Sequence, residues 1–393
     1  MLSWLIPKEF CCGLICAGIL KNLNTSTVLH ARLVYICLSL FFGLVSLFVK
    51  IFAQDAYSKL GFLMPDCLDG LCFSSHIIHA VMLSLAIFHF VVLGITMASD
   101  TLAFVCYQKC WVLKFLLYFI ILFICVWTTS VLDYYFWIAL VFSVVFICLQ
   151  SVYLIEFNYD WNDTWFDNYS NSSSQYWAVM LISFSVISWV LNIGMLIVTY
   201  MYSQYFWVSL GGFFAAVVIT VFSSSALCEN GCNEYLALLS SSVTMTYASY
   251  FLTSALVVDP EDQNYLILGL DILLSVLALV YLAFTVPDKL KPNGHHELNQ
   301  TEMKNFGNSS KEIEESKVES DEKEDQPRSN NMLFQSAIGC YCFFLGMVLT
   351  NWEWDLKGNS PLIAKCAQAG MCMGFYLWTL IAPTLFPDRD FSR

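Results

Sequence analysis

The chain has 393 residues, of which 58% are hydrophobic, 16% aromatic and 12% charged, and its formal net charge is -13. A water-soluble protein with a single core cannot carry this much apolar surface, so the composition excludes that class and indicates an integral membrane protein. We therefore predict an all-α, polytopic membrane protein with ten transmembrane helices and no nucleic-acid partner.

The first twenty residues are apolar, but Pro7, Lys8 and Glu9 divide them into pieces that are too short to cross a bilayer. We expect residues 1–31 to form a Cys-rich interfacial segment. A cleaved signal peptide is the alternative, which is disfavoured because the basic residues lie inside and after the apolar run and not before it. On the expected cytosolic side, three cysteines are chemically reasonable sites of S-acylation, with simple membrane burial as the alternative: Cys11, Cys12 and Cys16.

Ten segments of roughly 20 apolar residues follow, which is the length needed to cross about 30 Å of hydrocarbon. Eight lie within residues 32–285, and two lie in the last part of the chain, 332–393, which ends in a short tail. The predicted transmembrane helices are 32–53, 74–97, 108–130, 134–156, 176–200, 206–224, 234–256, 264–285, 332–350 and 364–385.

Two cysteines fall in the first predicted outer loop, PDCLDGLC. Cys67 and Cys72 would face a lumenal or extracellular compartment, where disulfides form. A disulfide between them and two free thiols are both open.

Two opposite charges lie near the cytosolic ends of the third and fourth predicted spans. Lys114 is about two turns inside the third span and Glu156 ends the fourth, so antiparallel neighbours would set them level. Because a charge inside a bilayer costs roughly 2.5 to 3.5 kcal/mol on insertion scales, we predict that Lys114 pairs with Glu156 near the inner headgroups, where it also could meet a lipid phosphate. Snorkelling of Lys114 to the interface is the alternative.

Polar side chains form stripes on two predicted spans. The seventh span, LLSSSVTMTYASYFLTSAL (residues 238–256), has hydroxyls at i, i+4, i+7 and i+11, on one side of a helix. The fifth span has a second stripe at i, i+3 and i+7. The stripes consist of Ser242, Thr246, Ser249 and Thr253 in the seventh span and of Ser185, Ser188 and Asn192 in the fifth.

These stripes have two interpretations. Small hydroxyl residues in membrane helices most often mediate close packing, each hydrogen bond giving about 0.6 kcal/mol. Two such stripes also suit a lipid headgroup that moves between leaflets, because a row of weak, neutral partners replaces its hydration without trapping it. Asp271, about two turns from the outer end of the eighth span, either lines the same path or stays protonated and donates a hydrogen bond to a neighbouring helix.

The one long polar segment, residues 286–331, is rich in Glu, Lys and Ser and nearly free of aromatic residues. It cannot bury enough apolar area to offset the entropy of ordering, so we expect an acidic, disordered cytosolic loop. Ser316 and Ser320 lie among acidic residues, a setting that suits phosphorylation. A solvated linker between two helical groups is the other interpretation.

The sequence gives little sign of enzyme chemistry. It holds no Gly-rich phosphate loop, Gly-x-Ser-x-Gly elbow or His-Glu-x-x-His helix, and the pair Asp69 and Gly70 lacks the companions of a metal cradle. His295 and His296 have no third ligand in sight. Cys228 and Cys232 have the wrong spacing for zinc. We expect no catalytic residue, no metal and no cofactor.

Lys and Arg residues concentrate on one side of the predicted bundle, and only four fall on the other: Lys50, Lys59, Lys357 and Lys365. By the positive-inside rule, both termini and the long loop are cytosolic. All Asn-x-Ser/Thr sites then lie on the cytosolic side, and we predict that none is glycosylated: Asn24, Asn162, Asn168, Asn171, Asn299 and Asn308.

Several segments, in order along nearly the whole chain, resemble the serine incorporator (SERINC) family of ten-span membrane proteins. They are NTSTVLHARLVY (24–35) after the Cys-rich N-terminus, WVLKF (111–115), QSVYLIEFNYDWNDTWFDN (150–168), LLSSSVTMTYASYFLTSA (238–255), TNWEWD (350–355) and YLWTLIAPTLFPDRDFS (376–392). Two features depart from the family pattern. Ile77, Ile78 and His79 stand where the family has Val-Tyr-Arg, and the outer loop after the seventh span is short and lacks cysteines.

The resemblance implies two small helical groups around a long, diagonally crossing fourth helix, with a lipid-accessible groove between them. The family took its name from a proposed role in supplying serine for phosphatidylserine and sphingolipid synthesis. Members have since been assigned passive phospholipid scrambling, and some restrict enveloped viruses. We expect passive scrambling, including that of phosphatidylserine, with a carrier or scaffold that supplies serine as the alternative.

The expected partners are membrane phospholipids and, for the alternative, serine or lipid-synthesis enzymes. The expected location is an endomembrane (endoplasmic reticulum, Golgi, endosome or vacuole) or the plasma membrane.

Overall fold

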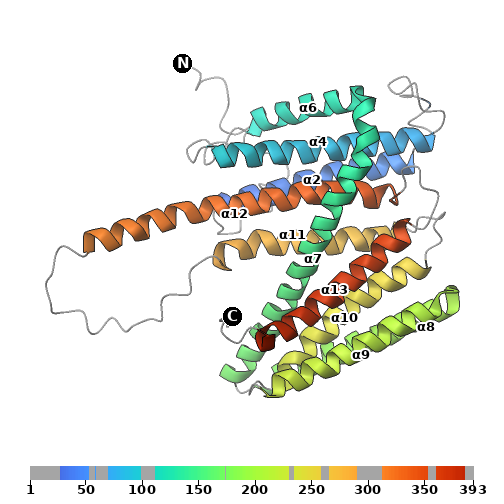
Figure 1. Ribbon diagram of the computed structural model, residues 1–393, viewed down its shortest axis with the longest axis vertical. Coiled ribbons are helices and arrows are strands. Elements are labelled where there is room, and N and C mark those ends of the chain that lie inside the picture. The colour runs from blue at the N-terminus through green and yellow to red at the C-terminus, as the bar shows by residue number, and fades with distance from the viewer. Residues whose placement is uncertain are drawn as a thin grey trace. The chain divides into compact units, whose positions relative to one another are not determined.

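The computed structural model of the protein describes residues 27–52, 58, 70–98, 111–172, 174–229, 234–257, 265–289, 312–352 and 360–385. These residues form ten helices (Figure 1) and include no strand, which confirms the all-α prediction. The helices are α2 (Thr27–Ile51), α4 (Gly70–Ala98), α6 (Trp111–Trp127), α7 (Thr129–Ser172), α8 (Gln175–Tyr202), α9 (Phe206–Glu229), α10 (Glu234–Val257), α11 (Tyr265–Lys289), α12 (Glu312–Leu349) and α13 (Ser360–Leu385).

Each predicted transmembrane segment overlaps one of these helices. Among the described residues, seven helices are long and apolar enough to cross a membrane: α2, α4, α7, α8, α9, α11 and α12. α6 is apolar but has 17 residues. α10 and α13 are long enough to cross a membrane, but their hydroxyl, amide and lysine side chains lower their mean hydropathy, so they are not among the seven.

α7 has 44 residues and continues well past the predicted end of the fourth span at residue 156. Its extension carries Trp161 and Trp165, whose ring centroids lie 5.2 Å apart and pack edge-on against Phe184 of α8 at 5.5 and 5.2 Å. These aromatic contacts stabilise the helix where hydropathy alone predicts that a span ends.

α12 begins at Glu312, so it covers the second half of the acidic segment for which the sequence predicts disorder. Over residues 312–330 the structure therefore has a helix where the sequence predicts disorder. The apolar part of α12 that could cross a membrane begins at Asn331, one residue before the predicted start of the ninth span.

The chain divides into two compact units. The first consists of Met1–Phe142 and Leu279–Gly346, and the second of Ser143–Ala278 and Met347–Arg393. α7, α11 and α12 each begin in one unit and end in the other.

In the first unit, α4 lies between α2 and α6 (Figure 1). His89 of α4 connects two other helices, because its Nε2 lies 3.4 Å from Ser39 Oγ on α2 and its Nδ1 lies 2.8 Å from Gln335 Oε1 on α12. Phe142 of α7 stacks on Phe343 of α12 at 5.1 Å. Buried hydrogen bonds and ring contacts thus fix which helices are neighbours.

Arg32 is a buried charge of this unit, with 1% of its surface exposed. Its Nη1 donates to the carbonyl oxygen of Ala283 on α11 at 3.1 Å, and its Nη2 donates to Asn331 Oδ1 on α12 at 3.0 Å. The guanidinium also lies 5.6 Å from the ring centroid of Phe334. Arg32 therefore connects α2, α11 and α12, since a buried charge is stable only where such partners surround it.

In the second unit, α10 is the central helix and contacts α8, α9 and α13 (Figure 1). Its Met245 belongs to a buried cluster with Ile155 of α7, Ala216 of α9 and Tyr376 of α13. α10 is thus surrounded by helices, and its polar residues face partners in several directions.

Gly346 tests the packing of the first unit. A Cβ at this position would lie 2.5 Å from Tyr135 Oη and 3.1 Å from Met82 Cβ, whereas a Cβ at Gly194 would meet no atom within 4 Å. We expect Gly346→Ala to lower the free energy of unfolding by about 1 to 3 kcal/mol through overpacking. Gly194→Ala should be neutral or stabilising by up to about 1 kcal/mol. Thermal unfolding of the purified variants measures both, and equal midpoints would contradict the close approach at Gly346.

Candidate functional site

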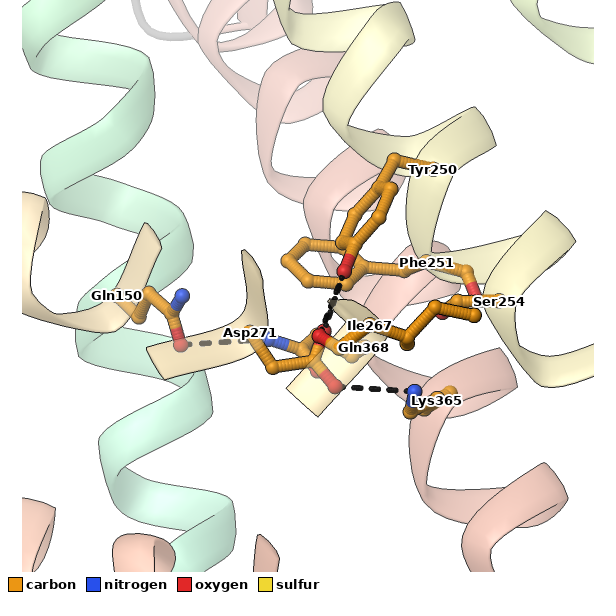
Figure 2. Close-up of polar contacts among 8 residues, drawn as sticks. All are labelled: Gln150, Tyr250, Phe251, Ser254, Ile267, Asp271, Lys365 and Gln368. Carbon is orange, nitrogen blue, oxygen red and sulfur yellow. Dashed lines mark hydrogen bonds and ion pairs between the residues drawn. The ribbon is translucent and has the colours of Figure 1, made fainter. Parts of the chain in front are cut away.

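A buried ion pair joins α11 and α13 in the second unit (Figure 2). Lys365 Nζ lies 2.9 Å from Asp271 Oδ2, and the two side chains are 16% and 8% exposed. Tyr250 of α10 donates its hydroxyl to Asp271 Oδ1 at 3.0 Å. Both carboxylate oxygens thus have partners, and three helices are joined at one residue.

In the sequence, Asp271 has no basic residue near it. The partner, Lys365, was assigned to the outer flanking charges although it lies inside the predicted tenth span. The pairing could have been predicted from the cost of burial. A single charge inside a membrane span is costly, so two opposite charges in different spans are expected to form an ion pair. The hydropathy pattern locates each helix, but it does not show that α11 and α13 are neighbours.

One turn along α13 from Lys365, Gln368 donates its Nε2 to Gln150 Oε1 of α7 at 3.3 Å (Figure 2). Further along α13, the Tyr376 hydroxyl lies 3.1 Å from Ser223 Oγ of α9, and Thr379 Oγ1 lies 3.1 Å from the Tyr159 hydroxyl of α7. None of these residues was predicted as a site.

Four of these side chains share one face of α13, since they are spaced i, i+3, i+11 and i+14. We call this the polar face of α13; it consists of Lys365, Gln368, Tyr376 and Thr379. At a rise of 1.5 Å per residue it is about 21 Å long. Charge is confined to the Lys365 end, and the rest of the face is neutral.

The two predicted stripes face each other across the contact between α8 and α10. Asn192 Nδ2 donates to Thr246 Oγ1 at 2.8 Å, and Thr246 Oγ1 lies 3.2 Å from the carbonyl oxygen of Ser188. Further along, Thr199 Oγ1 lies 3.3 Å from Thr253 Oγ1. We call this contact the hydroxyl seam; it consists of Ser185, Ser188, Asn192 and Thr199 of α8 with Ser242, Thr246, Ser249 and Thr253 of α10.

The seam is closed. Ser185, Asn192 and Ser242 are each at most 2% exposed, and both serine hydroxyls donate to backbone carbonyls of their own helices. In this structure the stripes therefore form a helix interface, which is the packing interpretation, and a lipid path along them requires that α8 and α10 separate. Thr199 was missed by the sequence, although it continues the face of Asn192 at i+7.

Lys114 is 7% exposed and its ammonium lies over two aromatic rings of the first unit. Its Nζ is 4.0 Å from the ring centroid of Trp111 and 5.2 Å from that of Tyr35. Glu156 is half-buried and belongs to the second unit. The pairing of Lys114 with Glu156 stays a prediction. His79, which stands at the position of the family arginine, is fully buried with its ring 4.6 Å from that of Tyr135.

The cysteine and modification predictions are only partly covered by the structure. Cys72 is disulfide-bonded. Its expected partner Cys67 lies outside the described residues, as do Cys11, Cys12, Cys16, Cys232, His295, His296, Asn24, Asn299 and Asn308. Cys228 lies in α9, and Ser316 and Ser320 lie in α12; nothing is described of these three side chains. Within the described residues, no group of three or more His, Cys, Asp or Glu side chains is placed to hold a metal ion.

Comparison with known proteins gives a consistent result. The sequence model of the family described as serine incorporator (Serinc) matches residues 7–389. A probable serine incorporator of Nematostella vectensis is 25% identical over 300 residues, which cover 64% of this chain and 65% of that protein. Serine incorporator 3 of Mus musculus is 22% identical over 305 residues, which cover 63% and 64%. The chain thus spans a little less than two thirds of each of these relatives.

A third relative is covered more fully. A membrane protein of Schizosaccharomyces pombe is 23% identical over 376 residues, which cover 84% of this chain and 83% of that protein.

The ion pair of Asp271 and Lys365 makes a specific prediction for stability. Lys365→Met leaves a buried carboxylate without its cation, and we expect a loss of about 3 to 5 kcal/mol in the free energy of unfolding. The double variant Asp271→Asn with Lys365→Met removes both charges and should recover most of that loss. Tyr250→Phe, which removes one hydrogen bond to Asp271, serves as the control with an expected loss of about 1.5 to 3 kcal/mol. Additive losses in the double variant would show that the pair does not act as a unit.

Proposed function

The chain belongs to the serine incorporator family, and from this premise we propose that it moves phospholipids passively between leaflets, phosphatidylserine among them, by transient opening of the hydroxyl seam. Such movement would change membrane lipid composition without an energy source. The observation that carries the proposal is the seam itself: a row of uncharged hydroxyl and amide groups between α8 and α10.

The seam covers about two thirds of the length that a headgroup path requires. From Ser185 to Thr199 it extends about 21 Å along α8, against about 30 Å of hydrocarbon. A headgroup that enters it exchanges water for weak, neutral hydrogen-bonding partners. No residue of the seam carries a charge that would hold the headgroup in place.

The polar contacts across the seam are individually weak. Three hydrogen bonds that involve side chains connect α8 to α10. At about 0.6 kcal/mol each, they contribute roughly 2 kcal/mol, so thermal motion can break them. α8 is the peripheral partner, because it carries many exposed apolar side chains, such as Val179, Val186 and Val190.

α10, by contrast, is held on its other faces. Tyr250 donates to Asp271, and Thr244 accepts a hydrogen bond from Asn158 of α7 at 3.0 Å. We therefore propose that α8 moves and α10 stays. In this arrangement Asp271, which the sequence suggested as a lining residue of the path, anchors the fixed wall of the seam.

The proposal includes the finer topology. We propose that all ten helices cross the membrane, that α7 is the long diagonal fourth span, and that both termini and the acidic loop are cytosolic. The protein would then act without catalytic residues in an endomembrane or the plasma membrane, with phospholipids as its partners.

A second candidate function is the supply of serine for lipid synthesis. Asp271 and Lys365 place opposite charges side by side in a buried site, which complements the ammonium and carboxylate of a free amino acid. This function predicts uptake of labelled serine, whereas scrambling predicts bidirectional lipid movement with no gradient.

A cysteine lock across the seam distinguishes these possibilities. The Oγ1 atoms of Thr199 and Thr253 are 3.3 Å apart, a spacing compatible with a disulfide after substitution. We expect vesicles containing oxidised Thr199→Cys/Thr253→Cys protein to flip labelled lipid as slowly as protein-free vesicles, and reduction to restore the rate. Each single cysteine variant, treated with the same oxidant, is the control. Rapid flip-flop by the locked protein would refute the seam as the path, and serine uptake by it would favour the carrier.

Glycosylation tests the proposed orientation. Asn168 and Asn171 lie near the end of α7 on the proposed cytosolic side, so glycosidase treatment should leave the mass of the cellular protein unchanged. Ala56→Asn creates an Asn-x-Ser site with Ser58 in the first proposed outer loop and should add a glycosidase-sensitive shift. A shift in the unmodified chain that is lost on Asn168→Gln or Asn171→Gln would invert the topology.

A further inference from the structure

Two buried asparagines on α7 have side-chain oxygens that receive no hydrogen bond from the part of the chain that the structure describes. Asn158 and Asn162 are each 1% exposed and lie one turn apart on the same face of the helix. Asn158 Nδ2 donates to Thr244 Oγ1 on α10 at 3.0 Å, and Asn162 Nδ2 donates to Asp163 Oδ1 at 3.3 Å. Within the described residues, neither Oδ1 atom accepts a hydrogen bond.

The hydrogen-bonding partners determine whether the nitrogen or the oxygen of each side-chain amide has no partner. Thr244 Oγ1 donates its proton to the carbonyl oxygen of Ser240 at 2.7 Å, so toward Asn158 it can only accept. The carboxylate of Asp163 likewise accepts. Each amide must therefore present its nitrogen to these groups, and the atoms that remain are the two carbonyl oxygens.

Two such oxygens can serve one ligand. Side chains at i and i+4 have Cβ atoms about 5 to 6 Å apart, which allows two amide oxygens to converge on a single small ion. Thr244 Oγ1 lies beside Asn158 and has a second lone pair available as a further ligand. A buried carbonyl oxygen without a donor is costly, and a cation removes that cost.

The surrounding charge favours a cation. From Phe115 to Asp288 the sequence contains no Lys, Arg or His, and Asp160 lies between the two asparagines while Asp163 follows them. In the described part of the second unit the one basic residue is Lys365, which contacts Asp271. Lys365 lies at the opposite end of the polar face of α13 from Thr379, which contacts Tyr159 next to Asn158.

We propose that Asn158 and Asn162 bind an alkali-metal cation between α7 and α10. Neutral amide and hydroxyl oxygens are hard ligands, and with no carboxylate in the set they suit a monovalent ion better than Ca²⁺ or Mg²⁺, whose protein sites are built on carboxylates. The bound ion strengthens the contact between the two helices at Asn158 and Thr244. The site is independent of the proposed lipid path, which lies on a different face of α10.

The test uses the purified full chain in lipid nanodiscs. Its thermal midpoint is measured in NaCl, in KCl and in choline chloride at one ionic strength. We expect at least one alkali-metal salt to raise the midpoint, saturably, by about 2 to 4 °C above choline, because an ion that binds only the folded state stabilises it. Equal midpoints in the three salts would overturn the site and leave a bridging water as the partner of the two oxygens.

Variants assign the response to these residues. Asn158→Leu and Asn162→Leu each remove one oxygen and should abolish the salt-specific shift, and Asn158→Asp should lower the half-saturating concentration of the ion. Asn192→Leu is the matched control: Asn192 is 1% exposed, donates to Thr246 of α10 and has an Oδ1 atom without a donor within the described residues. No acidic residue lies within two turns of it in the sequence.

Asn192→Leu should therefore destabilise the protein while keeping the full response to the ion. If either leucine variant at position 158 or 162 kept the full response, the site would be refuted. If a leucine variant failed to fold, the Asn158→Asp titration decides: an unchanged half-saturating concentration would refute the site as well.

Discussion

Polar side chains inside a bilayer have no water to bind, so each needs a partner on its own helix or on a neighbouring one, and the bonds between helices constrain which helices of each unit are paired. In the first unit, the guanidinium of Arg32 donates to a backbone carbonyl of α11 and to an amide oxygen of α12, and His89 connects α2 with α12. In the second unit, Asp271 brings α10, α11 and α13 together. An apolar helix face can pack against many different neighbours. These hydrogen bonds and ion pairs are more selective, because each requires a specific partner group on the neighbouring helix.

The polar contacts of α10 differ from one face of the helix to another, and the opening proposed for the hydroxyl seam depends on this difference. Toward α11, α10 donates a hydrogen bond to the carboxylate of Asp271, and toward α7 it has an amide–hydroxyl bond. Toward α8 its side-chain hydrogen bonds join uncharged groups alone. The charge-assisted contact with Asp271 is therefore the one that we expect to keep α10 in place while peripheral α8 moves.

Hydropathy was sufficient to locate the helices because an apolar run of about twenty residues is a strong signal. It failed at the end of α7, where Trp161 and Trp165 extend the helix by packing on Phe184, a contact that no local pattern reports. The spacing of Ser242, Thr246 and Thr253 correctly indicated one polar face. That this face meets the stripe of α8 depends on which helices are neighbours. The pairing of Asp271 with Lys365 was missed for the same reason, since periodicity describes one helix at a time.

The two units bury polar groups of opposite character. In the first, cationic Arg32 donates to carbonyl oxygens, and both Arg32 and Lys114 lie over aromatic faces. In the second, the long stretch without a basic residue leaves an interior of hydroxyl, amide and carboxylate oxygens, and Lys365 supplies a positive charge at one end only. An interior rich in oxygen and poor in protein cations attracts positive charge from outside. The cation proposed for Asn158 and Asn162 would therefore be favoured by the basic residues that the second unit lacks as much as by the oxygens that it contains.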